Sequence, residues 1–285
     1  MPRLAGTPRR CRGNAAILRE RNPTNVRLQI NVQLDYGLSR ACDLLLQIEA
    51  AAIPEQRIEE AHLGLSPCEH FARVPAQDHV GERIWLRTDS QFLVDYRAVV
   101  SIERIVRDVA TLPALPPHRL PGETVQYLLP SRYCPSHQFT DFVDNKFGML
   151  PGGAKLIAMQ DWVATHLSYV PGSSHSETNA ADTFHSGQGV CRDYAHLLIT
   201  LARAGEIPAR YTSVYAPGVT PPDFHAVAEV FLGGEWHLVD ATGMAKEAEM
   251  AKIGIGRDSG DVAFLTAFGP LMLNSQSVAV TMLAD

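Results

Sequence analysis

The chain has 285 residues, of which 46% are hydrophobic, and a formal net charge of −6 at pH 7. This length suits one large domain or two modest ones. The absence of a basic excess argues against nucleic acid as a partner, and no apolar run reaches the roughly 18 residues that cross a bilayer. We therefore expect a soluble globular protein with neither a nucleic-acid nor a membrane partner.

The first 25 residues are rich in arginine and contain one acidic residue, Glu20. No apolar stretch of about 7–15 residues follows, so a secretory signal is not expected. We predict a disordered or basic N-terminal extension over residues 1–25.

The cysteine pattern indicates a reducing compartment. The chain has five cysteines, an odd number, at positions 11, 42, 68, 134 and 191. No Cys-x-x-Cys pair and no zinc-like grouping occurs among them. We therefore expect a cytoplasmic protein with no disulfide framework.

Alternating hydrophobic and polar residues indicate two long strands between residues 26 and 110. One runs from Val26 to Asp35 and the other from Phe92 to Ile102, with an apolar side chain at every second position. This period of two is typical of antiparallel strands with one buried face. Shorter apolar runs at 44–48 and 84–86 indicate further strands. A small sandwich would bury all these faces, so we predict a β-rich, sandwich-like domain over residues 26–118.

A proline-rich stretch ends this pattern with four prolines between residues 113 and 121. Such a segment is stiff and extended, and few contacts usually cross it. We place a domain boundary near residue 118 and a second domain over residues 119–285.

Beyond the boundary the hydrophobic period becomes helical. Apolar residues recur at spacings of three and four from Leu156 to Leu167, which predicts an amphipathic helix. Residues 172–189 have the composition of a loop. A second helix begins at Cys191 and ends near Gly205, and Pro208 forbids its continuation. Residues 210–215 follow as a strand, so helices come before antiparallel strands, as in an α+β fold.

A β-hairpin is predicted next, with strands at 226–232 and 235–239 joined by Gly233 and Gly234. A two-residue turn sets Phe231 opposite Trp236 and therefore Val227 opposite Asp240. His225 is then the diagonal neighbour of Asp240 on the same face, within reach of its carboxylate. We expect the helix of Cys191 to pack against this face.

Cys191, His225 and Asp240 together have the residue types of a thiol nucleophile, its base and an orienting carboxylate. Gly187 and Gly189 precede Cys191, which places the thiol at a helix N-terminus where backbone N–H groups favour a thiolate. Each residue alone has a simpler interpretation, as a buried cysteine or a hydrogen-bonding surface group. Their combination favours the catalytic interpretation, with the Cys191 backbone N–H as oxyanion donor.

Two other sets of residues are weaker candidates. Four histidines, at positions 166, 175, 185 and 196, lack the spacing of metal ligands on a helix, so we predict no metal site. Gln188 could donate to an oxyanion or be an ordinary loop residue, and the sequence leaves both interpretations open.

Several motifs resemble those of the bacterial transglutaminase-like superfamily, whose members are often labelled cysteine proteases. Residues 189–197 resemble its nucleophile motif, residues 207–211 the segment after that helix, and residues 224–230 and 236–242 its histidine and aspartate motifs. Residues 256–263 resemble a further segment near the family's C-terminus. The resemblance covers roughly residues 120–275 in the expected order. Val227 and Ala241 depart from it, because many relatives carry Trp and Pro there.

The resemblance implies an α+β fold in which a papain-like core, with the nucleophile helix packed on an antiparallel sheet, follows a β-rich domain. It implies that Cys191 is the nucleophile, His225 the base and Asp240 the orienting residue, with no cofactor and no metal. The expected activity is acyl transfer or hydrolysis at an amide bond of a protein or peptide substrate. Water as acceptor gives hydrolysis, which we favour, and an amine gives cross-linking. The alternative is a non-catalytic scaffold or binding protein that retains the fold.

Overall fold

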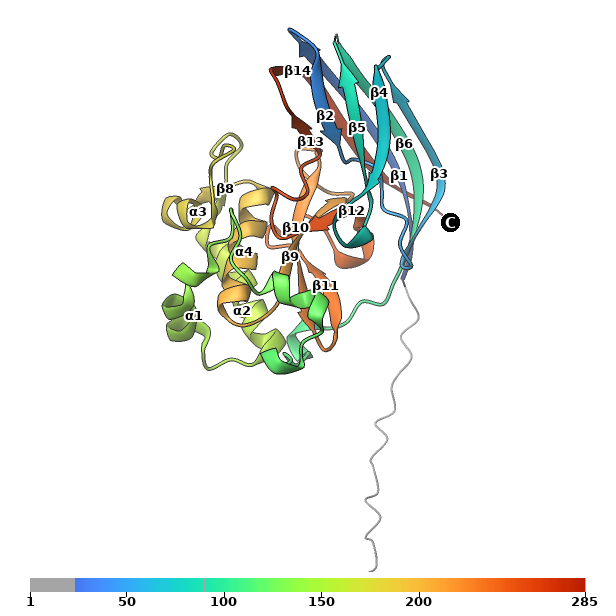
Figure 1. Cartoon of the computed structure of the whole chain (residues 1–285). Helices are drawn as coiled ribbons and strands as arrows, with labels where there is room; N and C mark the ends of the chain where they lie inside the picture. Colours follow the sequence, from blue (N-terminus) through green and yellow to red (C-terminus); the bar gives the residue numbers. More distant parts are fainter. Residues whose placement is uncertain (1–23, 90, 285) are drawn as a thin grey trace, which may run out of the picture.

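The computed structural model describes residues 24–89 and 91–284, so the extension predicted for residues 1–25 lies almost wholly outside the described residues. The chain forms a β sandwich and a part with helices packed on a sheet, which adjoin each other in Figure 1. The predicted α+β class is therefore confirmed. None of the helices in these two ranges is both long and apolar enough to cross a bilayer.

The sandwich consists of two antiparallel four-stranded sheets. The first has the order β14-β1-β6-β3, formed by β14 (Leu271–Leu283), β1 (Thr24–Leu38), β6 (Phe92–Arg104) and β3 (Gln56–Leu65). The second has the order β13-β2-β5-β4, formed by β13 (Leu265–Ala267), β2 (Cys42–Leu46), β5 (Glu82–Thr88) and β4 (His70–Pro75). Side chains of both sheets, among them Ile30, Val100 and Leu44, are buried in one shared core. The predicted sandwich is confirmed.

The two ends of the described chain meet in this sandwich. β14 pairs with β1 along most of its length, with Val278 opposite Val32, and β13 pairs with β2. The C-terminal strands thus complete the sheets of the N-terminal strands, although we had assigned them by position to the second domain. Figure 1 shows β14 returning beside the sandwich after the chain has passed through the helical part. The predicted boundary near residue 118 stays a prediction.

The second part has a four-stranded antiparallel sheet covered by helices. The sheet order is β11-β10-β9-β12, formed by β11 (Glu235–Val239), β10 (His225–Leu232), β9 (Ala209–Tyr215) and β12 (Ala251–Gly256). The helices are α1 (Thr140–Phe147), α2 (Gly152–His166), α3 (Ala180–Ser186) and α4 (Cys191–Ala204). Leu198 and Leu201 of α4 share a core with the small residues Ala226 and Ala228 of β10.

One expected loop contains structure that we did not predict. Residues 172–189 include α3 and the short strand β8 (Gln188–Gly189), which pairs in parallel with β7 (Ser168–Tyr169). Asn179 caps α3, because its Oδ1 accepts the backbone N–H of Ala181 while Asp182 accepts the N–H of Asn179. This reciprocal pattern is a capping box, so the sequence Asn-x-x-Asp at 179–182 was the available signal.

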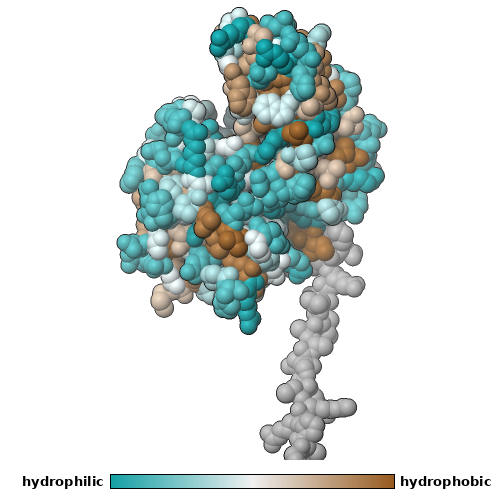
Figure 2. Space-filling view, viewed as in Figure 1, coloured by the Kyte–Doolittle hydropathy of each residue, from teal (hydrophilic) through white to brown (hydrophobic). Residues whose placement is uncertain are grey.

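The face of the molecule in Figure 2 is mostly hydrophilic, and its outline is indented between the sandwich and the helical part. The indentation lies on the side where α3 and β8 approach the sandwich in Figure 1.

Replacing Leu198 by Ala tests whether the α4–β10 contact stabilises the fold. Leu198 is fully buried, so Leu198→Ala should lower the free energy of unfolding by about 2–5 kcal/mol, measured by urea denaturation. Met149 is 97% exposed, so Met149→Ala should change it by less than about 0.5 kcal/mol. Equal losses of unfolding free energy in Leu198→Ala and Met149→Ala would contradict the assignment of Leu198 to the core.

Candidate active site

Cys191 is the first residue of α4 and is half-buried. Val190 precedes the helix in an extended conformation, and its carbonyl accepts the N–H of Asp193 at 2.8 Å and of Tyr194 at 3.1 Å. The N–H groups of a first helical turn have no intrahelical acceptor and carry a partial positive charge. The thiol therefore lies where a negative charge on sulfur is favoured.

Asp193 fixes the start of this helix. Its Oδ2 accepts the N–H of Val190 at 2.8 Å, and the side chain is almost completely buried. Gly189 makes room for it, because a Cβ at position 189 would lie 2.6 Å from the Cβ of Asp193. The packing of Asp193 thus explains why position 189, two residues before Cys191, is a glycine.

Tyr169 lies beside the nucleophile. β7 pairs with β8 so that Tyr169 is the partner of Gly189, and Val170 donates its N–H to Gly189 O at 3.0 Å. The phenol hydroxyl lies next to both the thiol and the backbone N–H of Cys191. Burial and the nearby charge of Cys191 raise the pKa of Tyr169 to about 12. The hydroxyl therefore keeps its proton at neutral pH and can donate it in a hydrogen bond.

His225 and Asp240 form the second half of the site. Nε2 of His225 lies 3.0 Å from Oδ2 of Asp240, and both side chains are buried. The hairpin register is the predicted one, with Phe231 opposite Trp236 and Ala228 opposite Val239. Gly233 and Gly234 form the turn with φ of 62° and 90°, a left-handed region that glycine adopts without steric cost.

Asp240 is held by the backbone around it. Thr242 donates its N–H to Oδ1 at 2.8 Å, and Ala245 donates its N–H to Oδ2 at 2.9 Å. Gln160 of α2 donates to the carbonyl of Asp240 at 2.9 Å. Burial opposes the charge of this carboxylate, but its hydrogen bonds with His225 and Thr242 lower the pKa of Asp240. Asp240 is therefore an ionised acceptor in a fixed position.

His225 is poised to carry a positive charge. Burial disfavours the protonated ring, but hydrogen bonds with Asp240 and Cys191 and the charges of both groups raise the pKa of His225 to about 9. Because Nε2 is bonded to Asp240, Nδ1 is the ring nitrogen left for Cys191. Cys191, His225 and Asp240 thus lie in the order of a candidate nucleophile, base and orienting carboxylate.

The expected position of α4 was wrong in one respect. The helix packs on the face of β10 that carries Ala226 and Ala228, whereas His225 and Val227 belong to the opposite face by strand alternation. Cys191 and His225 are each the first residue of their element, and Cys191 lies close enough for its charge to act on the ring of His225.

Other sequence candidates lie elsewhere. Gln188 is exposed on β8, and His196 is buried with Nε2 accepting the N–H of Ser259 at 3.1 Å. The ring of His166 stacks on Trp162 with centroids 4.3 Å apart. In residues 24–89 and 91–284, no group of three or more His, Cys, Asp or Glu side chains is placed to hold a metal ion.

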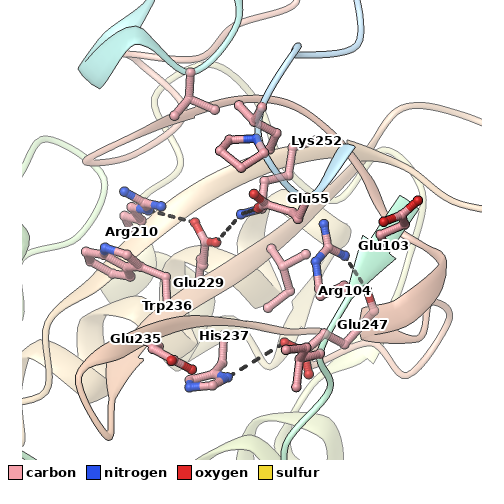
Figure 3. A pocket seen from close by; sticks show the side chains of 15 residues that line it. Glu55, Glu103, Arg104, Arg210, Glu229, Glu235, Trp236, His237, Glu247 and Lys252 are labelled. Atoms are coloured by element: carbon pink, nitrogen blue, oxygen red, sulfur yellow. Dashed lines mark hydrogen bonds and ion pairs between the residues drawn. The ribbon is translucent and has the colours of Figure 1, made fainter. Parts of the chain in front are cut away.

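A pocket lies further along the sheet, on the same face of β10 as His225. It has a volume of about 520 Å³ and lies between the sheet and residues 53–55 and 103–105 of the sandwich (Figure 3). Val227, Leu238 and Met250 form a small apolar cluster on this face, between His225 and the pocket. The pocket is thus separate from the candidate catalytic residues.

Buried ion pairs line this pocket, as Figure 3 shows. Glu229 is fully buried between Arg210, whose Nε lies 2.7 Å away, and Lys252, whose Nζ lies 2.5 Å away. Lys252 also bonds Glu55 of the sandwich at 2.8 Å. Burial opposes the charge of Glu229, but Lys252 and Arg210 lower its pKa to about 2.

This network joins the sandwich to the sheet. Removing one partner of a buried pair leaves the other charge uncompensated, so such pairs act as a unit. Arg210 also stacks on Trp236, with its guanidinium carbon 3.9 Å from the ring centroid. The charged side chains that line the pocket are thus engaged in ion pairs and stacking contacts within the protein.

Three comparisons relate this geometry to known proteins. The sequence profile of the Transglutaminase-like superfamily matches residues 140–241, which include Cys191, His225 and Asp240. A crystal structure from Cytophaga hutchinsonii, named a "putative cysteine protease", is 30% identical, with a TM-score of 0.87 and 92% of each chain covered. An uncharacterized protein of Mycobacterium leprae is 31% identical over 116 residues. That match covers 38% of this chain and 42% of the relative, so it spans less than half of that protein.

Cys191 should be the first cysteine alkylated by iodoacetamide at pH 6. The pKa of His225 is raised to about 9, so its ring is protonated at pH 6, and a positive charge beside a thiol makes that thiol more reactive. Burial raises the pKa of Cys134 to about 11, so Cys134 should react slowly. The advantage of Cys191 should fade as the pH rises through about 9, where His225 loses its proton. Peptide mass spectrometry would measure the order.

The control for this experiment is His225→Ala, which should slow the labelling of Cys191 at pH 6. Labelling of Cys11 or Cys68 before Cys191 in the unaltered chain would count against the site.

Glu247→Gln should stabilise the protein at pH 8 more than at pH 5. Burial raises the pKa of Glu247 to about 7, against an ordinary value near 4.5. The folded state therefore holds a proton that the unfolded state releases, and stability falls between pH 4.5 and 7 and stays lower above pH 7. Glutamine carries no charge, so Glu247→Gln removes the cost of burying the ionised Glu247 carboxylate. Melting temperatures at the two pH values would measure it, with Glu249→Gln on the same turn as the control. An equal effect of Glu247→Gln at both pH values would contradict the expectation.

Proposed function

Because the chain belongs to the transglutaminase-like superfamily, we propose that Cys191, His225 and Asp240 form a catalytic triad for cysteine-dependent acyl transfer or hydrolysis at amide bonds. The observation that carries this proposal is the bond from His225 Nε2 to Asp240 at 3.0 Å, which leaves Nδ1 for the thiol. A nucleophile, a base and an orienting acceptor are then connected in sequence. The name of the Cytophaga hutchinsonii protein agrees with this reaction class.

The first chemical step is attack of the Cys191 thiolate on the carbonyl carbon of an amide. A carbon–sulfur bond forms and the carbonyl electrons move to oxygen. His225, protonated at Nδ1, then gives its proton to the amine nitrogen as the carbon–nitrogen bond breaks. The product is a thioester on Cys191 and a free amine. Asp240 keeps the imidazole oriented and stabilises its positive charge during this step.

Two donors are available for the oxyanion of the tetrahedral intermediate. The backbone N–H of Cys191 is at the start of α4, and the hydroxyl of Tyr169 lies beside the same N–H. Preorganised donors of this kind stabilise the transition state more than the substrate. The backbone donor was predicted from the sequence, but Tyr169 was not, since a tyrosine 22 positions before the cysteine has no recognisable spacing.

The second step resolves the thioester. Neutral His225 removes a proton from water or from an amine, which attacks the thioester carbon and releases the Cys191 thiolate. Water yields a carboxylic acid, and an amine yields a new amide. A protein or peptide is the proposed acyl donor.

The triad roles can be separated with Cys191→Ala and Asp240→Ala. The probes are the blocked dipeptide benzyloxycarbonyl-Gln-Gly and a library of blocked peptides, with hydroxylamine as an amine trap. Cys191→Ala should form no acyl-enzyme by intact-protein mass spectrometry. Asp240→Ala should keep acylation with kcat lower by about 10²–10⁴-fold, because the orienting group is neither attacked nor transferred.

Wild-type activity in Asp240→Ala would remove Asp240 from the mechanism. Absence of any acyl-enzyme in the unaltered chain, with Cys191 no more reactive than an ordinary thiol, would favour the non-catalytic scaffold instead.

A further inference from the structure

A groove borders the candidate active site between the loop before β10 and the C-terminal strand β14. It has a volume of about 250 Å³. Ala216, Val219 and Pro222 line one side, and Val278 and Val280 of β14 line the other. Asp223 is the one charged side chain of the lining, which also includes the polar Thr281. The groove therefore has mostly apolar walls and a single negative charge.

Asp223 connects this groove to the nucleophile. It precedes His225 by two residues, and it lies close enough to Tyr169 for its charge to act on that phenol. Tyr169 in turn lies beside Cys191. Asp223 is thus connected to the candidate catalytic residues through His225 and Tyr169.

The carboxylate of Asp223 has only neutral partners. The N–H of Phe224 donates to Oδ1 at 2.7 Å, and Nε2 of Gln276 on β14 donates to the same oxygen at 2.5 Å. Oδ2 takes part in neither bond. Most other carboxylates named above are paired with a cation, as Glu229 is with Arg210 and Lys252. Asp223 is exposed, so its Oδ2 is accessible to a ligand.

We infer that this groove is a specificity subsite for a positively charged side chain of the amide substrate, with Asp223 as its counter-ion. The apolar walls suit the methylene groups of a lysine-like side chain, and the carboxylate suits its ammonium group. The exposed Oδ2 of Asp223 is free of both of its hydrogen bonds and can accept from such an ammonium group. This inference rests on the proposed function, since it names the substrate class of the same site.

Binding to Cys191→Ala tests the subsite without turnover. The probes are blocked glutamine peptides in which a neighbouring position carries lysine, dimethyllysine, arginine, norleucine or glutamate, scanned over two positions on either side. Lysine and dimethyllysine peptides should bind about tenfold more tightly than the norleucine peptide, the effect of one charge-assisted hydrogen bond. Dimethyllysine keeps the charge but cannot accept an acyl group, so it separates recognition from the acceptor role.

Variants of Asp223 test whether its carboxylate causes the preference for charged peptides. Asp223→Asn should abolish the preference for charged peptides, and Asp223→Glu should retain part of it, which also controls for misfolding. Asp95→Asn removes an exposed carboxylate that pairs with Arg97 on β6 and should leave the preference unchanged. The unaltered chain should show the same ranking in kcat/KM.

Two results would overturn the subsite. One is equal binding and turnover of lysine and norleucine peptides, which would leave the proposed function intact. The other is a charge preference that persists in Asp223→Asn. Charge-dependent binding to Cys191→Ala without acylation of the unaltered chain would instead support the subsite and contradict the proposed function.

Discussion

The contact between α4 and β10 is the constraint on which the site depends. Ala226 and Ala228 present only methyl groups to the helix, so Leu198 and Leu201 can pack directly against the strand. This close approach brings the first residue of the helix to the first residue of the strand. Bulkier residues in β10 would separate Cys191 from His225 without changing either residue. The chemistry of the site is thus set by the size of two side chains that take no part in it.

The candidate functional groups lie at the ends of helices and strands, while the interiors of these elements make the packing contacts. Cys191 begins α4, His225 begins β10, and Asp240 directly follows β11. Backbone groups at such ends lack regular partners and are free to orient side chains. Val190, Thr242 and Ala245 each donate an N–H to a carboxylate at the site. The rigid interiors fix where these ends lie, and the ends supply the polar contacts.

The sequence predicted local features well and long-range ones poorly. Gly233-Gly234 determines the hairpin register, because a two-residue turn leaves only one pairing, and so His225 could be set beside Asp240. The side of the hairpin that α4 covers was predicted wrongly, because we placed the helix by the His–Asp pair. The polarity of β10 carried the right signal, since one face has His225 and Glu229 whereas the face that meets the helix is wholly apolar. The two partners of Glu229 could not be predicted, since Arg210 and Lys252 lie on other strands, 19 and 23 positions away.

The pairing of β14 with β1 determines when the first sheet of the sandwich can be completed during synthesis. β14 is one of the two neighbours of β1, and it also forms a wall of the groove beside Asp223. During synthesis β1 emerges more than 200 residues before β14, so β1 keeps an unpaired edge until β14 has been translated. The first sheet of the sandwich and the groove are completed together at that point. A nascent or C-terminally truncated chain therefore contains Cys191, His225 and Asp240 without the wall that borders them.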